Sequence, residues 1–144
     1  MEKRRIVNVR YGFTMVELMA VLIIIGLLAT LVGTRVLKQI ENAKFATTKA
    51  NLKTLHTAVN QFYMDTGEFP TEEEGLMILI ESPEDIEGYD AGGYLEETEI
   101  PGDGWKNDFI YERFPESGKP FVIRSCGHDG EVDTEDDLLS TDAY

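Results

Sequence analysis

The hydrophobic and polar positions of this chain separate an apolar segment near its beginning from an amphipathic segment and a polar remainder. No charged residue occurs from Leu18 to Gly33, and the apolar segment from Phe13 to Thr34 contains 22 residues. A helix of that length, at about 1.5 Å per residue, can cross a hydrocarbon layer of about 30 Å. The pattern therefore predicts a transmembrane helix over residues 13–34.

The helical pattern continues beyond this segment, through residues 35–66. Apolar residues recur there at spacings of three, four and three, which predicts one buried face made of Leu52, Leu55, Val59 and Phe62. Gly67 is a favourable residue for ending a helix. We therefore expect one long helix from about Phe13 to Asp65.

The pattern of residues 67–144 predicts a small globular domain with few helices and strands. Thr71 and Glu74 have the capping-box spacing, which predicts a short helix over residues 72–81. Residues 82–104 are rich in glycine, proline and acidic residues, and we expect a long surface loop. Strand patterns occupy residues 109–114 and 121–125. The expected fold is α+β, with the long N-terminal helix packed on a small antiparallel sheet.

The charge is distributed unevenly along the chain. Residues 1–54 carry nine basic and three acidic side chains, whereas residues 55–144 carry four basic and 24 acidic ones. Such an acidic domain is repelled by nucleic acid, so we expect no nucleic-acid partner. The basic leader of residues 1–12 predicts a cytoplasmic N-terminus and an external C-terminal domain. Cys126 is the single cysteine, which excludes an internal disulfide.

The richest chemical pattern is residues 126–137, named here the acidic loop. Six of its twelve residues are carboxylates, and its glycines allow tight folding. Calcium binds six to eight oxygen ligands, so the loop is a candidate calcium site, although its glycine spacing is not that of an EF-hand. A solvated acidic loop is the alternative. Cys126 and His128 lie only two positions apart, and no familiar catalytic motif is present, so we expect no catalytic residue and no enzyme.

Residues 12–18 read Gly-Phe-Thr-Met-Val-Glu-Leu after the basic leader, and they resemble the type IV prepilin signature. The resemblance implies that a prepilin peptidase cleaves between Gly12 and Phe13 and methylates the new amino group of Phe13. It also implies that Glu17 pairs with the N-terminal amine of a neighbouring subunit during assembly. A secretory signal peptide and a plain signal anchor are the alternatives for this segment.

Two further segments resemble the major pseudopilins of type II secretion. Residues 66–76 are similar to the Tyr-Pro-Thr to Gly-Leu stretch of that family, and residues 103–111 to its Asp-Pro-Trp-Gly-Asn element. Gly104 and Lys106 depart from the second element, and Thr34 stands where many members have proline.

The acidic loop also resembles the calcium-binding loop of these pseudopilins, through Ser125-Cys-Gly-His-Asp-Gly and a following acidic pair. The resemblance implies Ca²⁺ as the bound ion and Asp129, Asp136 and Asp137 as side-chain ligands. Its further implied ligands are the carbonyls of Cys126 and Glu131, together with Thr134. The glycine pair common inside this loop is missing here.

The resemblance covers nearly the whole chain and implies a subunit that forms a homopolymer, the periplasmic pseudopilus, and so drives export of folded proteins across the outer membrane. The implied partners are prepilin peptidase, the minor pseudopilins and the inner-membrane assembly platform. The implied location is the inner membrane, crossed once, with the C-terminal domain in the periplasm. The alternatives are a type IV pilin, a minor pseudopilin, or a membrane-anchored calcium-binding domain that does not polymerise.

Overall fold

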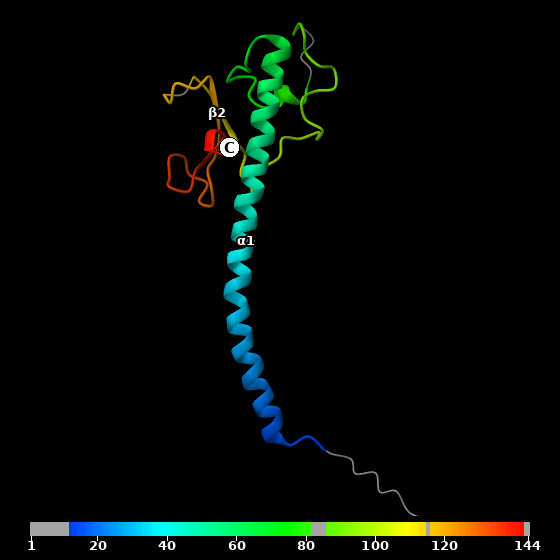
Figure 1. Cartoon of the computed structure of the whole chain (residues 1–144), viewed down its shortest axis with the longest axis vertical. Coiled ribbons are helices and arrows are strands. Elements are labelled where there is room, and N and C mark those ends of the chain that lie inside the picture. The colour runs from blue at the N-terminus through cyan, green and yellow to red at the C-terminus, as the bar shows by residue number, and fades with distance from the viewer. Residues whose placement is uncertain (1–11, 82–85, 115, 143–144) are drawn as a thin grey trace, which may run out of the picture. The chain divides into compact units, whose positions relative to one another are not determined.

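The computed structural model describes residues 12–81, 86–114 and 116–142, with only the backbone for residues 31–34. The basic leader, apart from its last residue, lies outside the described residues. The described elements are helix α1 (Met15–Thr66), the 3₁₀ helices η1 (Met77–Leu79) and η2 (Ser140–Asp142), and three strands (Figure 1). The chain divides between Gln39 and Ile40 into two compact units, which are described separately.

Helix α1 begins and ends within two residues of the predicted bounds. At its start, the backbone N–H of Glu17 donates to the Thr14 hydroxyl at 3.2 Å, which caps the first turn. At its end, the N–H of Gly67 donates to the Tyr63 carbonyl at 2.9 Å. Gly67 adopts φ 83°, a left-handed conformation that glycine reaches without steric cost and that ends the helix.

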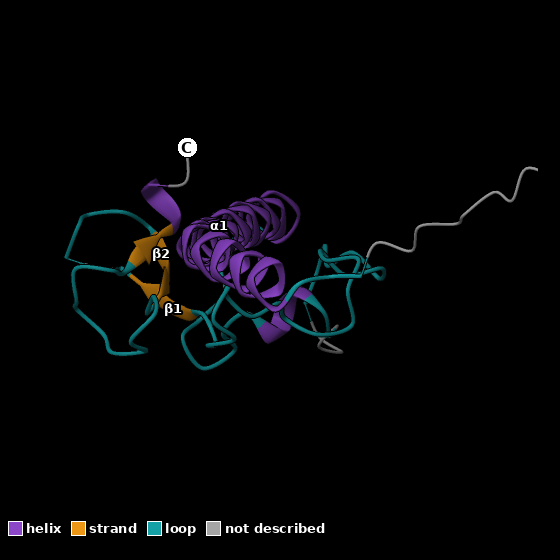
Figure 2. Ribbon diagram, turned by 90° about the horizontal axis from the view of Figure 1, so that it is seen from below, coloured by secondary structure: helices purple, strands orange, loops and turns teal. Residues whose placement is uncertain are grey.

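The second unit contains an antiparallel sheet of β1 (Ile110–Arg113), β2 (Phe121–Ser125) and β3 (Leu138–Leu139) in the order β1-β2-β3. Figure 2 shows β1 and β2 beside α1. The fold-class prediction, a long N-terminal helix packed on a small antiparallel sheet, is confirmed. Strand β3 is a finding that the sequence did not predict.

The core lies between this sheet and the second half of α1. The predicted helix face is confirmed, because its four residues are at most 3% exposed: Leu52, Leu55, Val59 and Phe62. Phe121 and Ile123 of β2 belong to the same buried cluster, as does Leu79 of η1. Strand residues alternate between the two faces of a sheet, so Val122 and Arg124 lie on the face opposite to α1.

The short helix predicted over residues 72–81 is wrong. The capping box does form, since the Thr71 N–H donates to Glu74 Oε2 at 2.8 Å and the Glu74 N–H donates to Thr71 Oγ1 at 3.3 Å. Gly75 then takes φ 57° in the left-handed region and ends the turn, and only the three residues of η1 follow as a helix.

The predicted surface loop is irregular over its described part, residues 86–104, but it contributes to the core. Tyr89 donates its hydroxyl to the Ile78 carbonyl at 2.7 Å, and the rings of Tyr89 and Tyr94 both contact Phe62. Residues 82–85 lie outside the described chain. The loop is therefore attached to the end of α1 by aromatic packing that its acidic composition concealed.

Candidate functional site

The acidic loop connects β2 to β3, and the pairing of these strands closes its base. Ser125 pairs with Leu138, and Arg124 with Leu139. The loop therefore begins and ends at neighbouring positions of one sheet edge, although only two residues form β3. Sequence reasoning predicted the loop but missed the strand that closes it.

A buried polar network fixes the first residues of the acidic loop. Asp103 is 5% exposed and accepts a hydrogen bond from the Ser125 hydroxyl at 2.7 Å. The Gly127 N–H donates to that hydroxyl oxygen at 3.2 Å, while Asn107 Nδ2 donates to the Gly127 carbonyl at 2.8 Å. Asp103 and Asn107 thus hold the first residues of the loop, a role that no sequence pattern indicated.

The segment that carries Asp103 is itself attached to α1. The Gly104 N–H donates to Thr48 Oγ1 at 2.8 Å, and Asn51 Nδ2 donates to the Gly102 carbonyl at 2.8 Å. Trp105 donates its indole N–H to Glu41 at 3.1 Å and packs edge-on against a phenylalanine of α1. These contacts anchor Trp105 and the segment around it to α1.

Three carboxylates of the acidic loop converge on one hydroxyl group. The hydroxyl oxygen of Thr134 lies 2.8 Å from Asp136 Oδ1, 3.3 Å from Asp137 Oδ1 and 3.4 Å from Asp129 Oδ1. The Glu131 carbonyl lies 3.4 Å from the same oxygen. A hydroxyl has a single proton to donate, so it can satisfy only one of these four acceptors at a time.

Asp136 accepts hydrogen bonds from one side chain and two backbone N–H groups of the acidic loop. The Thr134 hydroxyl, followed by the backbone N–H groups of His128 and Asp129, holds the pKa of Asp136 below its usual value. Hydrogen bonds that favour the charged form produce this direction of shift. The carboxylate of Asp136 therefore remains negative in mildly acidic solution.

The residues predicted as calcium ligands are brought together in part. The side chains of Asp129, Asp136 and Asp137 meet around Thr134, and the Glu131 carbonyl joins them. The Cys126 carbonyl instead accepts a hydrogen bond from the Gly130 N–H at 3.1 Å. Among the described residues, no group of three or more His, Cys, Asp or Glu side chains has the spacing of a metal site. Calcium binding therefore stays a prediction.

Cys126 and His128 do not form a nucleophile–base pair. The thiol is 5% exposed, and burial, with the nearby charge of Asp137, raises its pKa. His128 is exposed on the loop surface. A buried thiol with a raised pKa is a poor nucleophile because the thiolate is the reactive form.

The described part of the first unit presents exposed apolar side chains. Phe13 is 83% exposed, Leu18 53% and Leu27 64%. An 18-residue window of α1 has a mean hydropathy of 2.7 and is 0% buried. By length and composition this part of α1 can cross a membrane. Glu17 lies in its first turn, where the helix dipole favours a negative charge.

Comparisons with known proteins agree with both units. The chain matches the model of the family "Type II secretion system (T2SS), protein G" over residues 35–141 and that of the "Prokaryotic N-terminal methylation motif" over residues 8–33. It is 33% identical over 132 residues to type II secretion system core protein G of Escherichia coli K12, covering 90% of this chain and 89% of that protein. The core protein G of Aeromonas hydrophila is 33% identical over 141 residues, with 96% and 94% coverage.

A solved structure shares the fold. The major pseudopilin of the type 2 secretion system of enterohaemorrhagic E. coli superposes with a TM-score of 0.61 and 25% identity, covering 72% of this chain and 90% of that one. The exposed apolar helix, the methylation motif and the helix-on-sheet domain define a pilin-like protein. Within that class, the chain belongs to the type II secretion protein G family, the major pseudopilins. This family is a structural component of a secretion system and is not known as an enzyme.

Proposed function

We propose that this chain is the subunit of a pseudopilus, a homopolymer that extends into the periplasm and drives export of folded proteins across the outer membrane. The observation that carries the proposal is the apolar first part of α1, whose side chains are exposed in the described residues of their unit. These side chains are not buried in a soluble core, so packing within such a core does not explain why they are apolar. A membrane before assembly and neighbouring copies after assembly would cover the same surface.

The proposed maturation begins with cleavage between Gly12 and Phe13 by a prepilin peptidase and methylation of the Phe13 amine. The carboxylate of Glu17 then pairs with the N-terminal amine of a neighbouring subunit. A carboxylate and an ammonium that are buried together offset part of each other's desolvation cost, whereas either one alone is expensive in an apolar bundle. The match to the N-terminal methylation motif supports this proposal.

The proposed setting is the inner membrane, crossed once by α1, with the acidic domain in the periplasm. The proposed partners, besides other copies, are the minor pseudopilins and the inner-membrane assembly platform. Family membership and the exposed apolar helix support this setting. Type IV pilin, minor pseudopilin and non-polymerising anchor are less well supported, because the relatives found are core protein G.

Intact mass of the protein from its native membrane tests the maturation step. We expect the loss of residues 1–12 and the gain of one methyl group. Glu17→Leu should still be inserted and cleaved but should fail to assemble, whereas Glu17→Asp should retain partial assembly. A mature chain in which Glu17→Leu yields normal filaments would overturn the proposed ion pair. An uncut chain from cells with active peptidase would overturn the subunit proposal itself.

We also propose that Ca²⁺ binds the acidic loop. The chemistry of the donors supports the proposal, because hard carboxylate and carbonyl oxygens converge on the Thr134 hydroxyl, whose single proton can satisfy only one of them. Asp129, Asp136 and Asp137 would supply the charged ligands, with Thr134 and the carbonyls of Glu131 and Cys126 as the neutral candidates. Bound calcium would offset the mutual repulsion of the carboxylates and stabilise the domain.

Thermal unfolding of the full chain in a non-ionic detergent tests the calcium proposal. We expect Ca²⁺ to raise Tm relative to EDTA, by an amount that grows with free calcium as RT ln(1 + [L]/Kd). Asp136→Asn should remove most of this rise. Asp108→Asn, which changes an exposed carboxylate outside the loop, is the matched control. An unchanged Tm of the wild type in calcium would sink the proposal.

A further inference from the structure

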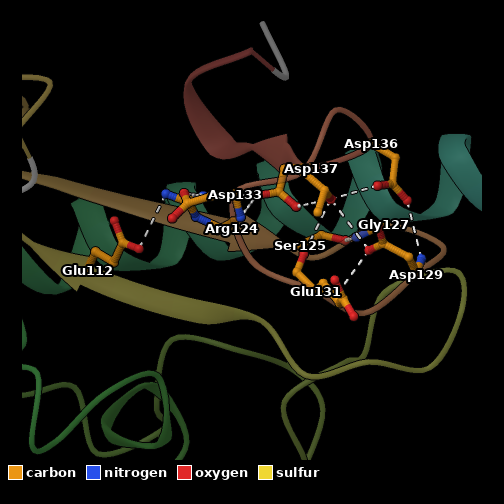
Figure 3. A network of polar contacts seen from close by, with 10 residues as sticks. Glu112, Arg124, Ser125, Gly127, Asp129, Glu131, Asp133, Asp136 and Asp137 are labelled. Carbon is orange, nitrogen blue, oxygen red and sulfur yellow. Dashed lines mark hydrogen bonds and ion pairs between the residues drawn. The ribbon is translucent and has the colours of Figure 1, made fainter.

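A positive side chain lies beneath the acidic loop, on the face of the sheet opposite to α1. Arg124 belongs to the central strand β2, and its side chain is only 16% exposed because the acidic loop folds across it. Figure 3 shows it among Glu112, Asp133 and Asp137. Strand periodicity explains the position, since Ile123 and Ser125 on either side face the opposite direction.

The guanidinium of Arg124 links the acidic loop to the sheet. Its Nη1 donates to Asp137 Oδ2 at 2.8 Å and to Asp133 Oδ1 at 2.6 Å. Its Nη2 lies 3.5 Å from Glu112 Oε1, on the neighbouring strand β1. The three contacts join residues from β1, from β2 and from the far end of the loop. Arg124 alone among the residues of Figure 3 contacts both strand β1 and the C-terminal part of the acidic loop.

Of the three contacts of Arg124, the one with Asp137 contributes most to holding the acidic loop. The Asp137 side chain is 9% exposed, whereas that of Asp133 is 80% exposed. Exposed ion pairs contribute little to stability, but removing one partner of a buried, hydrogen-bonded pair leaves an uncompensated charge and is strongly destabilising. Asp137 therefore depends on Arg124 for its charge balance, and Asp133 adds little.

Asp137 also belongs to the converging carboxylates, through its other oxygen. While Oδ2 accepts from Arg124 and from the backbone N–H of Asp133 at 2.9 Å, Oδ1 faces the Thr134 hydroxyl. Figure 3 shows Asp137 between Arg124 and Asp136. The guanidinium thus neutralises one carboxylate from the side, without occupying the place where the three carboxylates converge.

We propose that Arg124 is an internal cation that keeps the acidic loop folded on the sheet when no metal is bound, and that it shares Asp137 with the cation site. The second half of this inference rests on the calcium proposal, whereas the first half does not. Without metal, Arg124 holds the C-terminal part of the loop. The oxygens of Asp129, Asp136 and Asp137 that converge on Thr134 then remain available to bind a cation. Calcium then completes a loop that is already partly closed.

Hydrogen exchange of the full chain in non-ionic detergent tests this inference, in EDTA and in calcium. Two backbone amides report on the two halves of the loop. The N–H of Asp133 donates to Asp137 Oδ2 and reports on the arginine side, while the N–H of His128 donates to Asp136 Oδ2 and reports on the other. Variants are Arg124→Gln, the charge-retaining Arg124→Lys, and Lys119→Gln as an exposed control with the same charge change.

In EDTA we expect the Asp133 amide of Arg124→Gln to exchange roughly tenfold faster or more, because charge-assisted hydrogen bonds are lost. Arg124→Lys should fall between, and Lys119→Gln should match the wild type. Calcium should restore protection of the Asp133 amide in Arg124→Gln, because the ion would then balance the charge of Asp137. Equal exchange of Arg124→Gln and wild type in EDTA would overturn the inference. Fast exchange that calcium does not reverse, with no effect of calcium on wild-type Tm, would support the arginine's role and refute both the sharing and the calcium proposal.

Discussion

Gly104 is a position where the globular domain lies directly against the backbone of α1. A Cβ built on Gly104 would lie 2.6 Å from the carbonyl carbon and from the Cα of Lys44, and would also overlap the Lys44 carbonyl oxygen. These are backbone atoms of a helix, so they cannot move aside as the end of a side chain could. Gly104 is not among the residues with positive φ. Gly104→Ala therefore isolates a steric effect, free of the conformational strain that alanine suffers in the left-handed region.

The magnitude follows from two contributions. Forcing a methyl group into a packed contact costs about 1–3 kcal/mol. The displacement also breaks the hydrogen bond from the Gly104 N–H to Thr48, whose side chain is 0% exposed, at a cost of about 1 kcal/mol. We expect Gly104→Ala to lower the free energy of unfolding by about 2–4 kcal/mol. For a domain of about 100 residues this corresponds to a fall in Tm of about 10–20 °C.

Urea unfolding of the full chain in detergent measures the effect, with the fluorescence of Trp105 as the probe. Gly92→Ala is the matched control, because its nearest neighbour is a side-chain oxygen at 3.4 Å and its φ is also outside the left-handed region. The control should lose less than about 0.5 kcal/mol. Equal losses for the two alanines would refute the close approach to α1.

The remaining predictions concern single side chains of the second unit. Leu55→Ala should lower the free energy of unfolding by about 2–5 kcal/mol, measured in urea, because this side chain is 0% exposed; Met64→Ala, at a residue 75% exposed, should cost far less. Burial lowers the pKa of His56 from its usual 6.5. Between the lowered pKa and 6.5 the unfolded chain binds more protons than the folded chain, so the free energy of unfolding decreases as the pH falls through this range. His56→Gln should remove this component, at most about 1.4 kcal/mol per pH unit, from unfolding curves between pH 7 and 5. Cys126 should react with iodoacetamide at least about tenfold more slowly in the native chain than in denaturant, because its thiol is buried; equal rates would contradict its position. Lys106→Gly should raise stability by up to about 1 kcal/mol in urea, since Lys106 has φ 75° and glycine removes that strain at a smaller entropic cost.

The long helix was predictable because its signals are local and repeated. Apolar residues recur at helical spacing, and a glycine follows the last turn; the structure buries Leu52 and Leu55 as that spacing requires. Strand β2 was predictable for a similar reason, as a run of apolar residues after a turn. The two-residue strand β3 has no such signal. It forms because the end of the acidic loop pairs with β2, and this pairing depends on how the loop folds in three dimensions.

The acidic loop could be predicted in composition but not in arrangement. The carboxylate spacing indicated which side chains belong together, and three of them do meet around Thr134. Arg124 could have been found from strand periodicity, because it occupies an outward position two residues before the start of the loop. Asp103 and Asn107 could not, since their role depends on a contact made about 20 residues along the chain.

The two departures from the family's Asp-Pro-Trp-Gly-Asn element have opposite physical consequences. At position 104 a proline has no N–H to donate, whereas Gly104 donates to Thr48 and lies against the backbone of α1. At position 106 a glycine would adopt the left-handed conformation freely, whereas Lys106 adopts it under strain. This chain thus gains a hydrogen bond to the helix before the tryptophan and accepts strain after it. Trp105 donates to Glu41 and Asp103 accepts from Ser125, so residues 103–105 connect α1 to the start of the acidic loop.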